Sequence, residues 1–211
     1  YITSAGISLL NISTSESRLL YSNTTEDFFQ VPSLYYDDQL KRLWIGTGSA
    51  GLFYYDIIRK SLSDIPIRNF PKQPILAIRK DAKNTLLIGI DGQGIWNISE
   101  KGDTILHIYK EDLNNPFSLR GDGVYDILCD GSKNWIATFT GKLSFFENNN
   151  SQITPVTYQI NNPNSLGNNY VNQIIEDHEG HIWFATNNGV SRWDAASNKW
   201  KHYYQNKSEQ A

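Results

Sequence analysis

Short segments of alternating apolar and polar residues, separated by polar turns, run along the chain. The clearest copy has such segments at 171–176, 181–186, 190–194 and 199–204, with turns at 177–180, 187–189 and 195–198. Alternation with a period of two is typical of half-buried β-strands, and the turns hold the Asn, Asp and Gly that tight turns need. The pattern predicts four antiparallel strands joined by short turns.

This four-strand pattern recurs. Each copy contains an Asp, a polar turn, a strand that reads Trp-Ile-Gly/Ala-Thr or a close variant, and a closing glycine. The closing glycines fall at 6, 51, 94, 141 and 189. A period of roughly 45 residues, made of short strands, is the signature of a β-propeller blade. We predict an all-β fold, a β-propeller with four-stranded antiparallel blades, of which four are complete and a fifth is partial.

The repeat also sets the expected boundaries within one propeller segment, 1–211. We expect a partial blade at 1–30, blades at 31–72 and 73–110, a linker plus a blade at both 111–160 and 161–204, and a tail at 205–211. Seven blades of about 47 residues would need roughly 330 residues. The sequence therefore predicts a fragment of a larger, about seven-bladed ring, or a chain completed by neighbouring sequence or a partner.

Large aromatic residues recur at one position of the second strand. Trp44, Trp135 and Trp183 are expected to fill the space between neighbouring blades, with a Gly or Ala two residues later leaving room for them. Cys129 ends an apolar segment and is expected to be a buried structural thiol, with no internal disulfide, because it is the only cysteine.

Composition and charge narrow the function classes. Hydrophobic residues make up 39% of the 211 residues, enough for a core, and the formal net charge is −3. That charge gives no reason to expect binding to nucleic acid or to anionic lipid. The sequence has no apolar run approaching the roughly 18 residues of a membrane span.

A second sequence motif recurs in the linkers between blades. It reads Asn-Pro-x-Ser-Leu at 115–119 and 162–166, and the later copy runs into Glu176-Asp177-His178-Glu179-Gly180-His181-Ile182-Trp183. This combination resembles the two-component-regulator propeller repeat of bacterial hybrid two-component systems, in which one polypeptide carries a sensor, a membrane helix, a histidine kinase, a receiver and a DNA-binding domain. The resemblance covers essentially the whole chain, is strongest over 109–204, and is weaker in the second full blade, where Leu87 replaces Trp.

The resemblance implies a periplasmic sensor segment of an inner-membrane protein. Family members commonly detect oligosaccharides released from glycans and signal as dimers. The implied partners are therefore an oligosaccharide ligand, the adjoining blades and sensor domain of the same chain, and a second copy of the protein. Nucleic acid contact is not implied for this segment, and the membrane is reached only through other parts of the protein. None of the kinase chemistry lies in these residues, and no cofactor is expected.

Several other patterns suggest chemistry. Residues 46–51 match the dinucleotide pattern G-x-G-x-x-G, but an apolar strand follows them instead of the helix that would bind pyrophosphate. His178 and His181, with Asp177 and Glu179, suggest a weak metal contact, although a solvated turn is the preferred interpretation. The Asp turn also resembles the sialidase Asp-box, but it is one residue too long and lacks the Ser. No Ser-His-Asp or Cys-His arrangement is readable.

The expected ligand face is formed by the turns between second and third strands and by the blade linkers. The candidate ligand-binding residues there are Asp91, Gln93, Arg120, Asn168, Asn169, Tyr170, Asn187 and Asn188. Amides, carboxylates and an aromatic ring suit a neutral or acidic sugar, although each residue could simply be a turn former. Arg120 and Tyr170 are the favoured pair, because both flank inner strands and those border the central channel.

Three functions remain open from the sequence. The leading hypothesis is a non-catalytic, carbohydrate-sensing propeller segment. The second is a protein-interaction scaffold, which would show a contiguous exposed apolar patch. The third is a propeller lyase or glycosidase, which would show carboxylates or histidines with perturbed pKa values converging in the channel.

Overall fold

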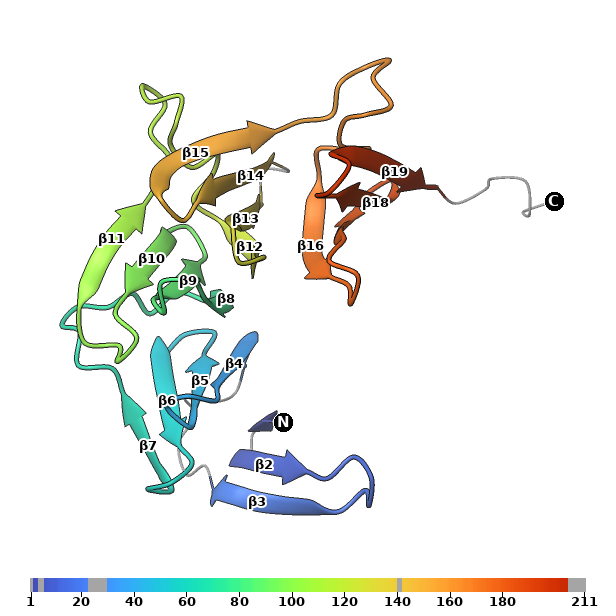
Figure 1. Ribbon diagram of the computed structural model, residues 1–211. Helices are drawn as coiled ribbons and strands as arrows, with labels where there is room; N and C mark the ends of the chain where they lie inside the picture. Colours follow the sequence, from blue (N-terminus) through green and yellow to red (C-terminus); the bar gives the residue numbers. More distant parts are fainter. Residues whose placement is uncertain (1, 4–5, 23–29, 140–141, 205–211) are drawn as a thin grey trace.

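The computed structural model describes residues 2–3, 6–22, 30–139 and 142–204, and every regular element in those ranges is a β-strand. The strands form one three-stranded and four four-stranded antiparallel sheets, arranged along an arc (Figure 1). The predicted all-β propeller fold is confirmed. The expected closing glycine 141 and the tail 205–211 lie outside the described residues, as do positions 1, 4 and 5 of the N-terminal remnant.

The sheets follow one another in chain order. The N-terminal sheet contains β1 (Ile2–Thr3), β2 (Gly6–Leu10) and β3 (Ser17–Ser22). Blade 1 contains β4 (Ser33–Asp37), β5 (Arg42–Gly46), β6 (Leu52–Asp56) and β7 (Ser61–Asp64). Blade 2 contains β8 (Ile75–Lys80), β9 (Leu86–Ile90), β10 (Gly94–Ile98) and β11 (Ile105–Tyr109). Blade 3 contains β12 (Val124–Cys129), β13 (Lys133–Thr138), β14 (Lys142–Glu147) and β15 (Asn150–Val156). Blade 4 contains β16 (Val171–Glu176), β17 (Ile182–Thr186), β18 (Gly189–Asp194) and β19 (Lys199–Tyr203).

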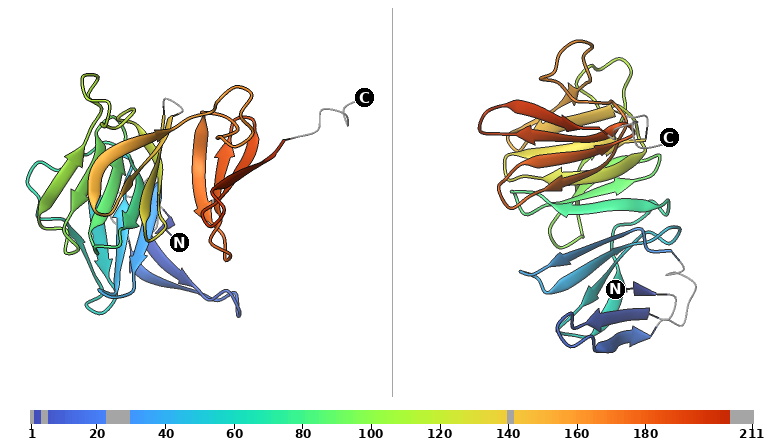
Figure 2. Two further views of the ribbon diagram at one scale, coloured as in Figure 1. Left: turned by 45° about the horizontal axis from the view of Figure 1, so that its top comes forward. Right: turned by 90° about the vertical axis from the view of Figure 1, so that its right-hand side faces the viewer.

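The first strands of the four complete blades, β4, β8, β12 and β16, lie next to one another on the inner side of the arc. The fourth strands β7, β11, β15 and β19 lie on the outer side, and further views show the sheets packed face against face (Figure 2). The register of β8, β12 and β16 shifts after their first residue, at Leu76, Tyr125 and Asn172, whereas β4 pairs without a shift. Such bulges increase the twist of a strand and redirect its side chains.

The hydrophobic core lies between blades. Trp44 of blade 1 is fully buried among side chains of blade 2, and Trp135 of blade 3 is 2% exposed against those of blade 4. Trp135 meets the rings of Phe184 and Trp193 edge-on, at centroid distances of 5.3 and 5.1 Å. The predicted inter-blade role of these two residues is confirmed. Trp183 differs: it is half-buried and stacks on Tyr203 of its own blade.

Polar contacts also join the blades. The Asp126 carboxylate of β12 accepts a bond from Arg79 of blade 2 at 3.1 Å and from the Ile174 N–H of blade 4 at 2.9 Å. Lys80 donates to Asp37 of blade 1 at 3.0 Å and to Glu100 of its own blade at 2.6 Å. Burial raises the pKa of Asp126, so its charge depends on these donors.

Two further expectations concern the burial of Cys129 and the absence of a membrane span. Cys129 is half-buried, not fully buried as expected, yet desolvation raises the pKa of its thiol to about 12, which keeps it protonated and unreactive. Among the described residues, no helix is long and apolar enough to cross a bilayer.

Candidate ligand-binding site

One face of the arc, here called the upper face, carries the turns between second and third strands together with the blade linkers. In each complete blade, an N–H of that turn donates to a carbonyl of the linker that precedes the blade. The pairs are Gly48 to Gln30, Asp91 to Pro74, Phe139 to Gly123 and Asn187 to Tyr170, at 2.7 to 3.1 Å. These repeated bonds place turn and linker side by side, as the candidate site requires.

The two Asn-Pro linkers fold in the same way. The Ser118 hydroxyl accepts the Asp112 N–H at 3.0 Å, and the Ser165 hydroxyl accepts the Gln159 N–H at 3.0 Å. The leucine that follows each serine is fully buried. The leucine of each Asn-Pro-x-Ser-Leu motif therefore anchors its linker in the core, and it fixes the residues that come after it.

A groove of about 420 Å³ lies on the upper face, against β14, β15 and the linker to blade 4. Its lining consists of Arg120, Lys142, Leu143, Pro155, Val156, Thr157, Asn169 and Tyr170. Three of the eight predicted residues meet here: Arg120, Asn169 and Tyr170. The groove borders third and fourth strands as well as the linker residues that precede β16. The expected position beside the central channel stays a prediction.

Contacts within the linkers hold the side chains of Arg120 and Asn169, whereas that of Tyr170 is exposed. The Arg120 guanidinium donates to the Pro116 carbonyl at 2.6 Å. The Asn169 amide oxygen accepts the Tyr158 N–H at 2.7 Å, which leaves the two donors of its NH₂ group as the end available to a ligand. The Tyr170 side chain is 53% exposed, so its ring offers an apolar surface at the groove.

The other five predicted residues lie outside this groove. Asn168 accepts the Tyr170 N–H at 2.8 Å, and the Asn188 N–H donates to the Thr186 hydroxyl at 3.2 Å, which are local turn contacts. The Asn187 side chain accepts from Asn172 at 2.9 Å, and Gln93 accepts from Lys110 at 3.2 Å. Asp91 is exposed in its turn. Whether any of them binds a ligand stays a prediction.

Sequence reasoning did not select Lys142, which lines the groove. With a closing glycine expected at 141, the sequence pattern indicates only that residue 142 begins an ordinary strand. In the structure, Lys142 itself pairs with Thr138 at the position that Gly94 and Gly189 occupy in blades 2 and 4. Aligning the blades by strand register, and not by glycine, would have identified it.

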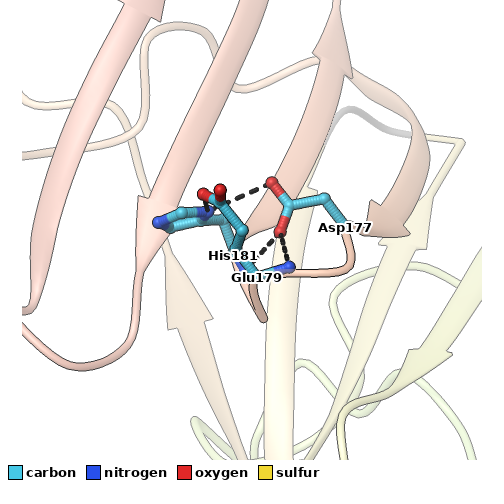
Figure 3. A group of neighbouring side chains, drawn as sticks. All are labelled: Asp177, Glu179 and His181. Atoms are coloured by element: carbon cyan, nitrogen blue, oxygen red, sulfur yellow. Dashed lines mark hydrogen bonds and ion pairs between the residues drawn. The ribbon is translucent and has the colours of Figure 1, made fainter.

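The opposite face carries the turns that begin with aspartate. Asp177, Glu179 and His181 lie close enough together to share an ion, with their ligand atoms within 4.8 Å of one another (Figure 3). However, Asp177 already accepts the N–H groups of Glu179 and His181 at 2.9 Å and the indole N–H of Trp183 at 2.7 Å. These donors, the indole first, hold the pKa of Asp177 well below its usual range.

The equivalent turn of blade 3 explains this cluster. Asp130 accepts the N–H groups of Ser132 and Lys133 and the indole N–H of Trp135 at 2.8 Å. Because the same contacts recur without a histidine, we interpret the cluster as a structural turn. The nearby His178 is exposed and lies 3.9 Å from Glu179.

A second histidine position is also structural. The ring nitrogens of His202 lie 3.1 Å from the Ser191 hydroxyl and 3.2 Å from the Pro163 carbonyl. With both nitrogens engaged in these contacts, the imidazole is placed to hold a linker to an outer strand. It is poorly placed to act as a general base.

Comparisons with known proteins give a family and a fold. The family model described as two component regulator propeller matches residues 165–188, from the linker of blade 4 to its upper turn, and confirms the stated resemblance. No curated protein matches the chain.

Solved structures resemble the chain over most of its length. The extracellular domain of BT4673 from B. thetaiotaomicron, described as a hybrid two component system, is 19% identical, with a TM-score of 0.52, over 95% of this chain and 33% of that one. The corresponding domain of BT3049 is 17% identical, with a TM-score of 0.65, over 90% and 26%. The β-propeller domain of Cps50 (Swd1) from Myceliophteria thermophila is 12% identical, with a TM-score of 0.57, over 83% and 56%. The chain thus spans a third or less of the two bacterial domains, and these likenesses establish the propeller fold.

Proposed function

We propose that this chain, a β-propeller with a two-component-regulator propeller repeat in blade 4, is an extracytoplasmic ligand-sensing segment of a hybrid two-component signalling protein. Its ligand is a glycan-derived oligosaccharide, and the signal passes to a histidine kinase elsewhere in the same protein. The observation that carries the proposal is the groove of the upper face, where Arg120, Asn169 and Tyr170 meet.

The family match and the neighbours support the setting. Two structural neighbours are extracellular domains of proteins described as hybrid two component systems, and this chain covers a third or less of each. We propose that the segment works beside further blades and a sensor domain of a longer chain, that the protein signals as a homodimer, and that it lies in the periplasm. The segment itself is proposed to be non-catalytic.

The groove has the chemistry that a sugar needs. An oligosaccharide presents hydroxyl groups, which amide and guanidinium groups bind, and apolar ring faces, which stack on aromatic side chains. Asn169 and Arg120 provide the former, and Tyr170 with the Leu143 and Val156 walls provides the latter. A volume of about 420 Å³ lies within the usual range of small-ligand sites.

The position of the groove suggests how binding is transmitted. Arg120 precedes blade 3, whereas Asn169 and Tyr170 precede blade 4. A ligand that contacts all three residues favours one relative placement of the two blades and shifts the population toward it. That shift is the signal we propose.

A thermal-shift measurement tests the proposal. The chain is heated with each member of a panel of glycan-derived oligosaccharides, and a saturable rise in melting temperature with one sugar class is expected, about 2.7 kcal/mol of stabilisation at a concentration 100 times Kd. The Tyr170→Ala variant should lose this rise in melting temperature. The Tyr36→Ala variant should keep it; Tyr36 is a half-exposed tyrosine near the C-terminal end of β4. No rise with any sugar would contradict the proposal.

One observation favours the scaffold as a second candidate. Leu113 and Ile160 occupy the same position in the two Asn-Pro linkers, two residues before the asparagine, and are 92% and 77% exposed. A large aliphatic side chain that is this exposed in both copies suits an anchor for a protein partner. If the sugar panel fails, loss of partner binding in Leu113→Ser and Ile160→Ser would support this function.

A further inference from the structure

We propose that the groove binds the anionic group of an acidic saccharide, a sugar that bears a carboxylate or a sulfate, through Arg120 and Lys142. This inference rests on the proposed function and narrows its ligand class.

The side chain of Lys142 is present at a position where two other blades exclude one. Gly94 and Gly189 have φ of +74° and +92°, and a Cβ on either would collide with the backbone carbonyl oxygen of Tyr109 or Tyr203 in the outer strand. Lys142 pairs at the same register, opposite Thr138, and carries a side chain there. Blade 3 therefore places a cationic side chain on the upper face where blades 2 and 4 have only backbone.

The second cation is Arg120, which precedes the inner strand of the same blade. Its bond to the Pro116 carbonyl at 2.6 Å holds the guanidinium beside the groove before a ligand arrives. A guanidinium with five N–H donors is well suited to carboxylate and sulfate, and an orientation fixed in advance reduces the entropy lost on binding.

The charge of the lining is opposite to that of the protein. Both charged residues among the eight lining residues are cationic, whereas the whole chain has a net charge of −3. An acidic group faces Lys142: the Glu111 carboxylate lies 4.0 Å from its ammonium. Lys142 is 48% exposed and Glu111 33%, so this contact is weak and an incoming anion can compete with it.

The apolar part of the lining is the reason to propose a saccharide as the ligand and not a free anion. Tyr170 offers an exposed ring, and Leu143, Pro155 and Val156 offer an aliphatic wall. A small inorganic anion would use the two cations and leave these surfaces unused. A sugar ring would use both.

The test compares charged and neutral sugars on the 211-residue chain. Calorimetric titrations use a galacturonic acid trisaccharide, its methyl ester, a galactose trisaccharide, a sulfated galactose trisaccharide and sodium sulfate. We expect the uronate or the sulfated sugar to bind at least about tenfold more tightly than the neutral sugars, and inorganic sulfate to bind far more weakly.

Three variants assign the effect to the groove. Lys142→Gln should weaken binding of the charged sugar about tenfold, and Glu111→Gln should strengthen it, because it removes the competing carboxylate. Lys83→Gln, an exposed lysine in a turn of the opposite face, should leave binding unchanged.

The outcomes separate this inference from the proposed function. Equal affinity for charged and neutral sugars would overturn the inference and keep the sensing function, whereas no binding of any sugar would overturn both. Preference for the charged sugar that survives in Lys142→Gln would place the anion elsewhere and overturn the assignment to this groove.

Discussion

At the scale of single residues, aspartates organise the turns on the face opposite the upper face. In three of the complete blades, the aspartate that begins this turn accepts the backbone N–H two residues later, as the contacts of Asp37, Asp130 and Asp177 show. The indole bonds of Trp135 and Trp183 were not predicted, because they depend on which face of the hairpin each Trp takes. In blade 1 the Asp37 carboxylate binds Lys80 of the next blade, and among the described atoms the buried Trp44 indole nitrogen has no hydrogen-bond partner.

These contacts predict a pH dependence of stability. The pKa of Asp177 is depressed in the folded chain, so its contribution is fully present above the unfolded pKa near 4 and is lost progressively as the pH falls below that value toward the depressed pKa of the folded chain. We expect Asp177→Asn to reduce the fall in melting temperature between pH 7 and pH 3, measured by scanning calorimetry. Glu147→Gln, an exposed carboxylate on β14, is the control. A fall in Asp177→Asn equal to that of the unaltered chain would contradict the assignment.

At the scale of strands and turns, the repeat predicted most of the structure. Its strands in blade 4 begin and end within one residue of those observed, because alternation and turn residues are local properties. The groove was predicted only in part. Arg120, Asn169 and Tyr170 were selected from loop position, but their meeting with Lys142 depends on strand register and on how far the linker crosses the blade, neither of which is written in a local pattern.

Two glycines of one turn test the register argument. Gly92 and Gly94 both have positive φ, but a Cβ on Gly92 would meet open space, whereas one on Gly94 would collide with the Tyr109 carbonyl. We expect Gly92→Ala to lower the free energy of unfolding by about 1 kcal/mol and Gly94→Ala by about 3 kcal/mol or more, measured by urea denaturation. An equal decrease in the free energy of unfolding for both variants would show that the outer strand moves easily at this point.

At the scale of the whole molecule, the main contacts between strands of different blades, among the described residues, join adjacent blades. Blades 2 and 3 have a described blade on both sides, and β9 of blade 2 is buried at every position. Blade 4 packs against blade 3, and β17, its equivalent of β9, is only partly buried. Stability in such arrays is the sum of blade and interface contributions, so it should vary along the arc.

Hydrogen exchange measures this variation. We expect the amides of β9 and β13 to exchange most slowly, β17 faster, and the exposed β3 fastest, because opening of an outer blade breaks one interface and opening of an inner blade breaks two. Mass spectrometry of peptides from each strand provides the rates. Equal rates in β9 and β17 would mean that the chain opens only as a whole.

The glycine register of the upper face also limits how blades diverge. A side chain at Gly94 or Gly189 destabilises blades 2 and 4, because the outer strand would have to move to make room for it. Blade 3 is free of that restriction, and residue 142 can change charge, size or polarity while its strand pairing persists. The ligand preference that we propose for the groove can therefore be changed at residue 142 without disturbing the strand pairing of blade 3.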